Sequence, residues 1–408
     1  MSPSADHATV DVLSPEVYQY GDPTTNGLPI DLYARLREHE PCYRHTMDDP
    51  AMRDSVWVVS RHEDIVRIDR DDETFVSSKG LNIQKFHATG GSMIHLDGPD
   101  HRRHRGVVRT AFTPRAVEAY TDGFRSLARR IVAEAVQRET FDFVESIAIP
   151  MPLNAICNLL DVPDEDRRQL LAWINAFAVV TDPEMSPSPS AAAEGALKTG
   201  QYALQLVEQR RRRPKRDLLA LIVEALDLGT LTTEELASLG VLLAGAGADT
   251  TRNTLSHAIH ELMRNPEQMA WIRRHADDIP REAIQEILRW GCPVIHFGRT
   301  VVKDTVVAGQ EVCAGDFVAM IFPSGNYDPK VFDHPETFDL TRAHNPHVSF
   351  GVGPHSCLGK HLAALEIKIL LEELLAATTE IQQVAPIAYA RDSRLRGVRS
   401  LPVTVARG

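Results

Sequence analysis

One of the five cysteines stands apart because of the sequence around it. Cys357 lies in residues 350–359, which read Phe-Gly-Val-Gly-Pro-His-Ser-Cys-Leu-Gly. Two glycines and a proline require a tight, irregular backbone there, and a helical pattern follows over residues 359–377. We therefore expect the sulfur at a helix N-terminus. The helix dipole and free N–H groups, including those of Leu358 and Gly359, would lower the thiol pKa and favour a metal-bound thiolate. The alternative is a buried cysteine before a helix.

An acid and an alcohol are neighbours in the middle of a long predicted helix. Residues 246–251 read Ala-Gly-Ala-Asp-Thr-Thr and contain Asp249 and Thr250. Gly245 and Gly247 each cost a helix up to about 1 kcal/mol, which indicates a functional reason. A glycine lets a ligand approach the backbone, and the Thr250 hydroxyl can open the helix groove. The alternative is an Asp-Thr pair that merely satisfies the helix backbone.

Two further pairs of charged residues have helical spacing. Glu286 and Arg289 are three residues apart on a predicted helix, and His101 and Arg105 are four apart in a basic stretch. Each pair therefore shares one helix face. Without other information, the first is an ordinary surface ion pair of little energetic weight, and the second is a solvated face.

The elements that must position these residues are mainly helical. The clearest helix spans residues 232–265, because Thr232 and Glu235 form a capping-box pattern and Pro266 disfavours helix in the residue before it. Further helices are predicted over residues 114–136, 164–180, 191–211, 280–290 and 359–377, and strands over 55–60, 304–307, 317–322 and 401–405. The predicted fold is mainly α with small β-sheets. Residues 182–190, rich in proline and serine, predict a mobile loop between two helices.

The composition is that of one globular domain. The 408 residues are 43% hydrophobic and 25% charged, with no linker or repeat, so we expect a single domain over residues 1–408. Five scattered cysteines without a C-x-x-C pair argue against a disulfide framework or a zinc site. A net charge of −12 argues against nucleic acid as a partner. There is no signal-peptide pattern or membrane-length apolar run, which predicts a cytoplasmic protein without a membrane anchor.

The string over residues 350–359 resembles the haem-binding loop of the cytochrome P-450 family, whose fixed positions are all present. This resemblance implies the family fold, a single mainly α domain that encloses haem b with the Cys357 thiolate as iron ligand. It makes His355 a donor to a haem propionate. It also places further loop residues at the cofactor: Phe350, Gly351, Leu358 and Gly359. The resemblance extends over residues 95–402, and residues 1–47 contribute little to it.

The same resemblance implies roles for the acid–alcohol pair and for the pair of His101 and Arg105. Residues 246–251 resemble the oxygen-activation segment, in which an acid followed by an alcohol delivers protons. Asp249 and Thr250 would act there on dioxygen, the co-substrate, with Ala246 beside the haem. His101 and Arg105 resemble a family helix start that binds propionate.

The resemblance also assigns one more cation and a clamp. Arg299, in a Phe-Gly-Arg-Thr run, matches the family's propionate-binding arginine. Glu286 and Arg289 become a structural clamp behind the haem. The family commonly adds a third basic residue where this chain has Thr337, so Arg342 is a candidate substitute.

A substrate pocket is placed by the resemblance. Its predicted lining is mainly apolar: Phe86, Phe177, Leu243, Val294, Ile295, His296 and Phe297, with a turn near Arg394. His296 and Asn175 could hold a polar group of the substrate. We expect a medium to large lipophilic molecule such as a terpenoid, steroid or polyketide, in secondary metabolism.

The implied reaction is monooxygenation, either hydroxylation or epoxidation. No flavin or iron–sulfur module is recognisable, so electrons must come from another protein, and we expect a ferredoxin with an NAD(P)H-dependent ferredoxin reductase. Six cations are expected near the thiolate side, where an acidic partner could dock: Arg102, Arg103, Arg109, Arg115, Lys360 and Lys368. The alternatives are peroxide-driven oxidation or coupling, a haem-thiolate sensor or carrier without turnover, and a haem-free helical binding protein.

Overall fold

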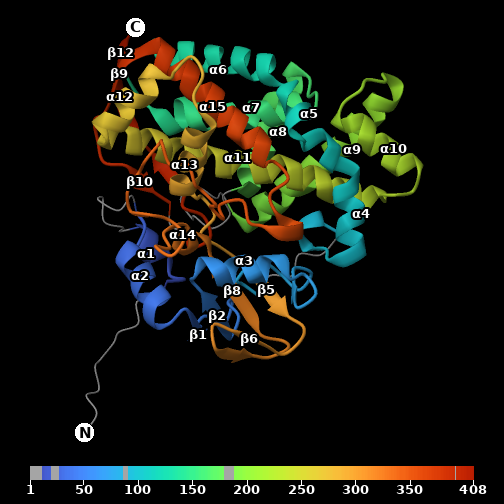
Figure 1. Ribbon diagram of the computed structural model, residues 1–408. Coiled ribbons are helices and arrows are strands. Elements are labelled where there is room, and N and C mark those ends of the chain that lie inside the picture. Colours follow the sequence, from blue (N-terminus) through green and yellow to red (C-terminus); the bar gives the residue numbers. More distant parts are fainter. Residues whose placement is uncertain (1–11, 20–26, 86–90, 179–187, 391) are drawn as a thin grey trace.

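The computed structural model describes residues 12–19, 27–85, 91–178, 188–390 and 392–408. It is mainly helical, with the strands gathered in small sheets, as expected (Figure 1). The helices are α1 (Pro15–Gln19), α2 (Ile30–His39), α3 (His62–Arg70), α4 (Gly98–Val108), α5 (Pro114–Glu118), α6 (Thr121–Ala135), α7 (Pro150–Leu159), α8 (Asp164–Ala178), α9 (Pro189–Arg212), α10 (Leu218–Asp227), α11 (Thr233–Arg264), α12 (Pro266–Arg274), α13 (Arg281–Gly291), α14 (Phe322–Asn326) and α15 (Lys360–Ala377).

The strands form four sheets in the described residues. They are β1 (Cys42–Thr46), β2 (Ser55–Val59), β3 (Phe75–Val76), β4 (Thr140–Asp142), β5 (His296–Val301), β6 (Thr305–Val307), β7 (Gln310–Val312), β8 (Phe317–Ile321), β9 (Thr378–Gln383), β10 (Ala388–Tyr389), β11 (Val398–Ser400) and β12 (Pro402–Arg407). The largest sheet has the order β1-β2-β8-β5-β3, with β2 and β8 parallel and its other pairs antiparallel. It lies with α3 on one side of the molecule, away from most helices (Figure 1).

Helix α11 passes through the middle of the helical part (Figure 1). It begins as the sequence predicts, because the Thr232 hydroxyl accepts the N–H of Glu235 and the Glu235 carboxylate accepts the N–H of Thr232. It ends at Arg264, with Asn265 as its C-cap before Pro266. Its second half is buried almost completely, so this helix forms the centre of the core.

Some predicted elements differ from the observed ones. Residues 114–136 form two helices, because the chain turns at Ala119 and Tyr120 between α5 and α6. Most of the loop expected over residues 182–190 lies outside the described residues, and its last two residues begin α9. Within the described ranges, no helix combines the length and apolarity that crossing a bilayer requires.

Candidate active site

The loop before Cys357 folds against the end of α3. Gly351 and Gly353 have φ values of 61° and 69°, a region that favours glycine. A Cβ on Gly353 would lie 2.5 Å from the backbone oxygen of Asp69. The N–H of Cys357 donates to the carbonyl oxygen of Phe350 at 2.8 Å. The two glycines therefore allow the close approach that fixes the cysteine backbone.

Cys357 stands just before α15, whose N-cap is Gly359. The residue lies deep within the protein, yet its side chain is solvent-accessible and can be reached by a ligand. Burial raises the pKa of the thiol, while the Gly359 N–H and the cations of Arg105 and Lys360 act in the opposite direction. The expectation that the helix N-terminus would lower this pKa was therefore wrong for the polypeptide alone, because desolvation outweighs it. A metal cation at the sulfur would favour the thiolate.

Ala246 and Thr250 lie in the middle of α11. Ala246 is exposed although the helix is central, and the Thr250 hydroxyl donates to the Ala246 carbonyl at 2.9 Å. One of the two neighbouring glycines, Gly245, has a different role from the one expected. A Cβ on Gly245 would lie 2.7 Å from the ring of Phe177, and one on Gly247 would lie 3.4 Å from Ile156. Close packing of α8 thus explains Gly245, whereas a Cβ at Gly247 would make only an ordinary van der Waals contact with α7.

Asp249 is buried and pairs with Arg252 on the same helix. The Arg252 guanidinium lies 2.9 Å from the Asp249 carboxylate. Burial raises the pKa of Asp249, while Arg252 and Arg394 counteract that rise. Asp249 therefore holds a proton more readily than an exposed aspartate does. The sequence reading identified the acid but missed Arg252, although the three-residue spacing was the available signal.

The two predicted histidines meet in space. The rings of His101 on α4 and His355 in the cysteine loop stack with centroids 4.1 Å apart. His355 Nε2 lies 3.3 Å from the Ser77 hydroxyl and 3.8 Å from the Asp97 carboxylate. Burial, followed by the nearby charge of His355, lowers the pKa of His101 to about 4. His101 is accordingly neutral near pH 7 and can donate one N–H without a charge.

Of the two arginines predicted to bind propionate, Arg105 contacts the cysteine loop itself, and Arg299 contacts Asp69 on α3, the helix against which the loop folds. Arg105 donates to the Ser356 carbonyl at 2.6 Å, directly before Cys357. Arg299 on β5 is buried and lies 2.6 Å from Asp69. Sequence reasoning missed Asp69 because its helix, α3, was not predicted. The four predicted propionate donors thus come from α4, β5 and the loop, and three of them touch the loop or its neighbours directly.

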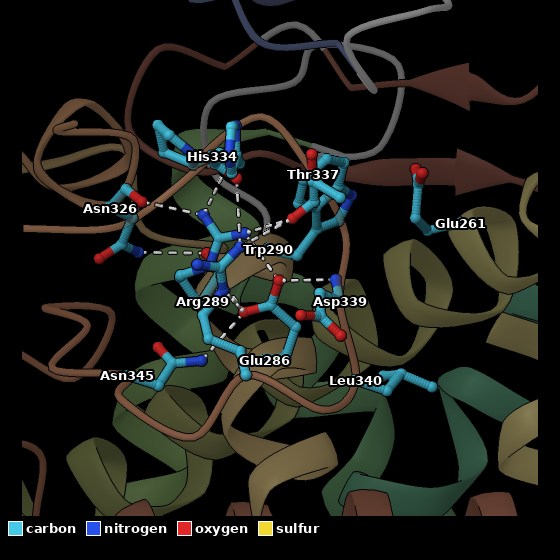
Figure 2. A network of polar contacts seen from close by, with 12 residues as sticks. Glu261, Glu286, Arg289, Trp290, Asn326, His334, Thr337, Asp339, Leu340 and Asn345 are labelled. Carbon is cyan, nitrogen blue, oxygen red and sulfur yellow. Dashed lines mark hydrogen bonds and ion pairs between the residues drawn. The ribbon is translucent and has the colours of Figure 1, made fainter.

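Glu286 and Arg289 form a fully buried pair on α13, shown in Figure 2. Both Arg289–Glu286 hydrogen bonds are 2.7 Å long, and Arg289 also donates to the carbonyl oxygens of Asn326 and Pro335. Burial opposes the charge of Arg289, but its bonds to Glu286 outweigh that effect, so the pKa of Arg289 is raised. Arg342 donates to Glu286 at 3.1 Å. Arg342 therefore supplies the third cation that Thr337 cannot.

The predicted pocket residues have different degrees of burial. Ile295 and His296 are buried, whereas Phe177, Leu243 and Phe297 are half-buried. His296 Nδ1 lies 2.9 Å from the Ser393 carbonyl oxygen and must donate to it, since that oxygen can only accept. Val294 forms a β-bridge with Leu395. Phe86 lies outside the described residues.

Comparisons with known proteins place these features in a family. A family model described as Cytochrome P450 matches residues 192–379. A steroid C26-monooxygenase of Rhodococcus jostii is 32% identical over 95% of this chain and 85% of its own length. A methyl-branched lipid omega-hydroxylase of Mycobacterium bovis is 33% identical over 85% and 83% of the two chains. A Mycobacterium marinum cytochrome P450 structure in complex with pseudoionone is 33% identical and has a TM-score of 0.89, and the match covers 99% of each chain.

Proposed function

Because the chain belongs to the cytochrome P450 family of haem monooxygenases, we propose that Cys357 provides the thiolate ligand of its haem iron. The observation that carries this proposal is an accessible thiol two residues before Gly359, the N-cap of α15. The other four cysteines do not combine these features. Three are buried, and the exposed Cys313 lies beyond β7, away from any helix N-terminus.

The residues around Cys357 fit haem b. A thiolate is a soft ligand for iron, and two propionates need cationic or N–H donors when partly buried. Arg105, Arg299, His101 and His355 supply such donors near the loop. When bound, the haem supplies the activation of dioxygen and the insertion of one oxygen atom into a lipophilic substrate. Phe350, Gly351, Leu358, Gly359 and Ala246 are proposed to contact it.

Asp249 and Thr250 are proposed to deliver protons during oxygen activation. Burial raises the pKa of the Asp249 carboxyl, so it holds a proton more readily than an exposed aspartate does and is proposed to donate it. The Thr250 hydroxyl stands one residue further along the helix and is tied to the Ala246 carbonyl. A rotation of that hydroxyl would pass a proton toward the exposed Ala246 face.

A ferredoxin, reduced by an NAD(P)H-dependent reductase, is the proposed electron donor. Four of the six expected cations are exposed and form no ion pair with any described residue: Arg102, Arg109, Arg115 and Lys360. Arg103 instead binds Glu235, and Lys368 binds Asp278, so these two are engaged within the protein. Arg102 lies on α4, Arg109 directly follows α4, Arg115 lies on α5 and Lys360 begins α15. These four cations would attract an acidic partner.

The substrate is proposed to be a branched lipid of steroid or terpenoid type. The named substrates of two relatives, a steroid and a methyl-branched lipid, favour this class over a polyketide. The half-buried Phe177, Leu243 and Phe297 agree with an apolar body. The cytoplasmic location and the role in secondary metabolism stay predictions from the sequence.

The test is product formation from a steroid or terpenoid with labelled dioxygen, surrogate ferredoxin, reductase and NAD(P)H. Incorporation of one labelled oxygen atom, dependent on all components, is expected. Label-free product formed only with added peroxide would favour the peroxide-driven alternative instead. Haem binding without any product from a broad lipophilic panel would favour a sensor or carrier.

A further inference from the structure

Arg394 lies in a turn that is fixed against the predicted pocket. The turn connects β10 to β11, and the Arg394 carbonyl accepts the N–H of Ile295 at 2.8 Å. The adjacent Leu395 forms its bridge with Val294, and the Ser393 carbonyl accepts from His296. The backbone position of Arg394 is therefore determined on both sides by contacts with the start of β5.

The charge of Arg394 reaches the centre of α11. It lowers the pKa of Asp249, after burial has raised it and Arg252 has lowered it. Arg394 thus lies within electrostatic range of the proposed proton donor, and its carbonyl contacts Ile295 just before β5. In the proposed site, Arg394 would place a cation beside the substrate.

The Arg394 guanidinium has no hydrogen bond or ion pair with any residue in the described part of the chain. Its Nε is buried without a partner, although the residue is half-buried as a whole. Two acids that could pair with it are engaged elsewhere. Asp249 binds Arg252, and the Asp392 carboxylate accepts the backbone N–H of Arg394 rather than its side chain. A buried donor without an acceptor is costly, so an acceptor from a ligand would be favoured.

Resting on the proposed function, we propose that Arg394 binds the carboxylate of an acidic lipophilic substrate. A guanidinium matches a carboxylate with two parallel hydrogen bonds, which fix orientation as well as affinity. The apolar residues of the predicted pocket, among them Val294, Phe177 and Phe297, would accept the apolar body. The preferred substrate is then a lipid, terpenoid or steroid that already carries a carboxyl group, so an upstream oxidation or hydrolysis must generate that acid.

The test compares acids with matched alcohols on the haem-loaded protein at neutral pH. The probes are hexadecanoic acid with hexadecan-1-ol, and a steroid with a carboxylic side chain with its alcohol. Dissociation constants are measured by calorimetry and by the haem absorbance change, for wild type, Arg394→Leu and Arg394→Lys. Lys303→Leu, an exposed residue beyond β5, removes the same charge elsewhere and serves as the control.

The expected result is an affinity loss of at least about tenfold for at least one acid in Arg394→Leu, with the alcohols unchanged. Arg394→Lys should retain part of that affinity, and Lys303→Leu all of it. Equal losses for acids and alcohols, no loss, or failure of the wild type to prefer either acid would overturn the proposal. The carbon monoxide spectrum is recorded on every sample, so a failed haem-thiolate site is recognised separately from a failed carboxylate site.

Discussion

The carboxylate of Asp69 lies 2.6 Å from the guanidinium of Arg299, and this contact joins α3 to β5. The second carboxylate oxygen of Asp69 accepts the N–H of Val352 at 2.7 Å, within the cysteine loop. One buried acid thus holds both a proposed propionate donor and the loop that carries Cys357. We therefore expect loss of Asp69 to weaken haem retention.

Replacing Asp69 with leucine should destabilise the protein by about 3–5 kcal/mol, because Arg299 would remain as an uncompensated buried charge. Haem content after purification should also fall. Urea unfolding and the haem-to-protein absorbance ratio measure the two effects. Glu73→Leu, at an exposed position, is the control and should change stability by less than about 0.5 kcal/mol. Equal stability of the two variants would contradict the assigned role of Asp69.

Arg342 should be the third member of the clamp on α13. The change Arg342→Leu removes its bond to Glu286 and those to the Asp333 and Thr337 carbonyls. We expect a loss of about 1.5–3 kcal/mol in the free energy of unfolding, the usual range for a hydrogen bond to a charged group. Arg281→Leu, at the exposed start of α13, is the control variant. If both variants unfold at the same urea concentration, Arg342 does not stabilise the clamp.

Thr250→Ala should separate electron consumption from product formation. Loss of the hydroxyl removes the proposed proton donor next to Asp249, so NAD(P)H should still be oxidised while product per NAD(P)H falls by at least about tenfold. Thr250→Ser restores the hydroxyl and should recover most of the yield. The measurement is the ratio of product to NAD(P)H, together with peroxide release. An unchanged ratio in Thr250→Ala would remove Thr250 from the proton path.

Glu366 on α15 should make the protein less stable as the pH rises. Burial raises the pKa of this carboxyl well above its usual value, and its Oε2 has no partner among the described residues. The folded state therefore keeps a proton that the unfolded chain releases above its ordinary pKa. The stability that this proton provides is lost as the pH rises toward the folded pKa. Glu366→Gln should thus gain stability relative to wild type between about pH 5 and about pH 8. Urea unfolding of both proteins at the two pH values measures this gain. A difference in their free energy of unfolding that is the same at both pH values would contradict the prediction.

Local patterns were sufficient for the long helix and for the cysteine loop. The Thr232–Glu235 capping box and Pro266 define α11 at both ends, since capping and proline act within one helical turn. The glycines before Cys357 likewise indicate a backbone conformation with positive φ, which other residues rarely adopt. Each of these signals depends on residues close together in the chain, so the sequence alone is enough to recognise it.

Contacts between distant elements were not accessible in the same way. Asp69 precedes its partner Arg299 by 230 positions, and no local pattern links them. Gly245 is small because Phe177 of another helix packs on it, which only the arrangement of α8 and α11 reveals. The lack of a partner for the Arg394 guanidinium among the described residues follows from its neighbours in space, whereas its sequence neighbours suggest an ordinary turn.

The most direct test of the haem-thiolate assignment is the carbon monoxide difference spectrum of the reduced protein. Wild type should give the strongly red-shifted Soret band of a thiolate-bound haem, and Cys357→Ala should lose it. Cys313→Ala, at the exposed cysteine beyond β7, should keep the band. An unshifted band in wild type, or a shifted band that survives in Cys357→Ala, would contradict ligation by Cys357.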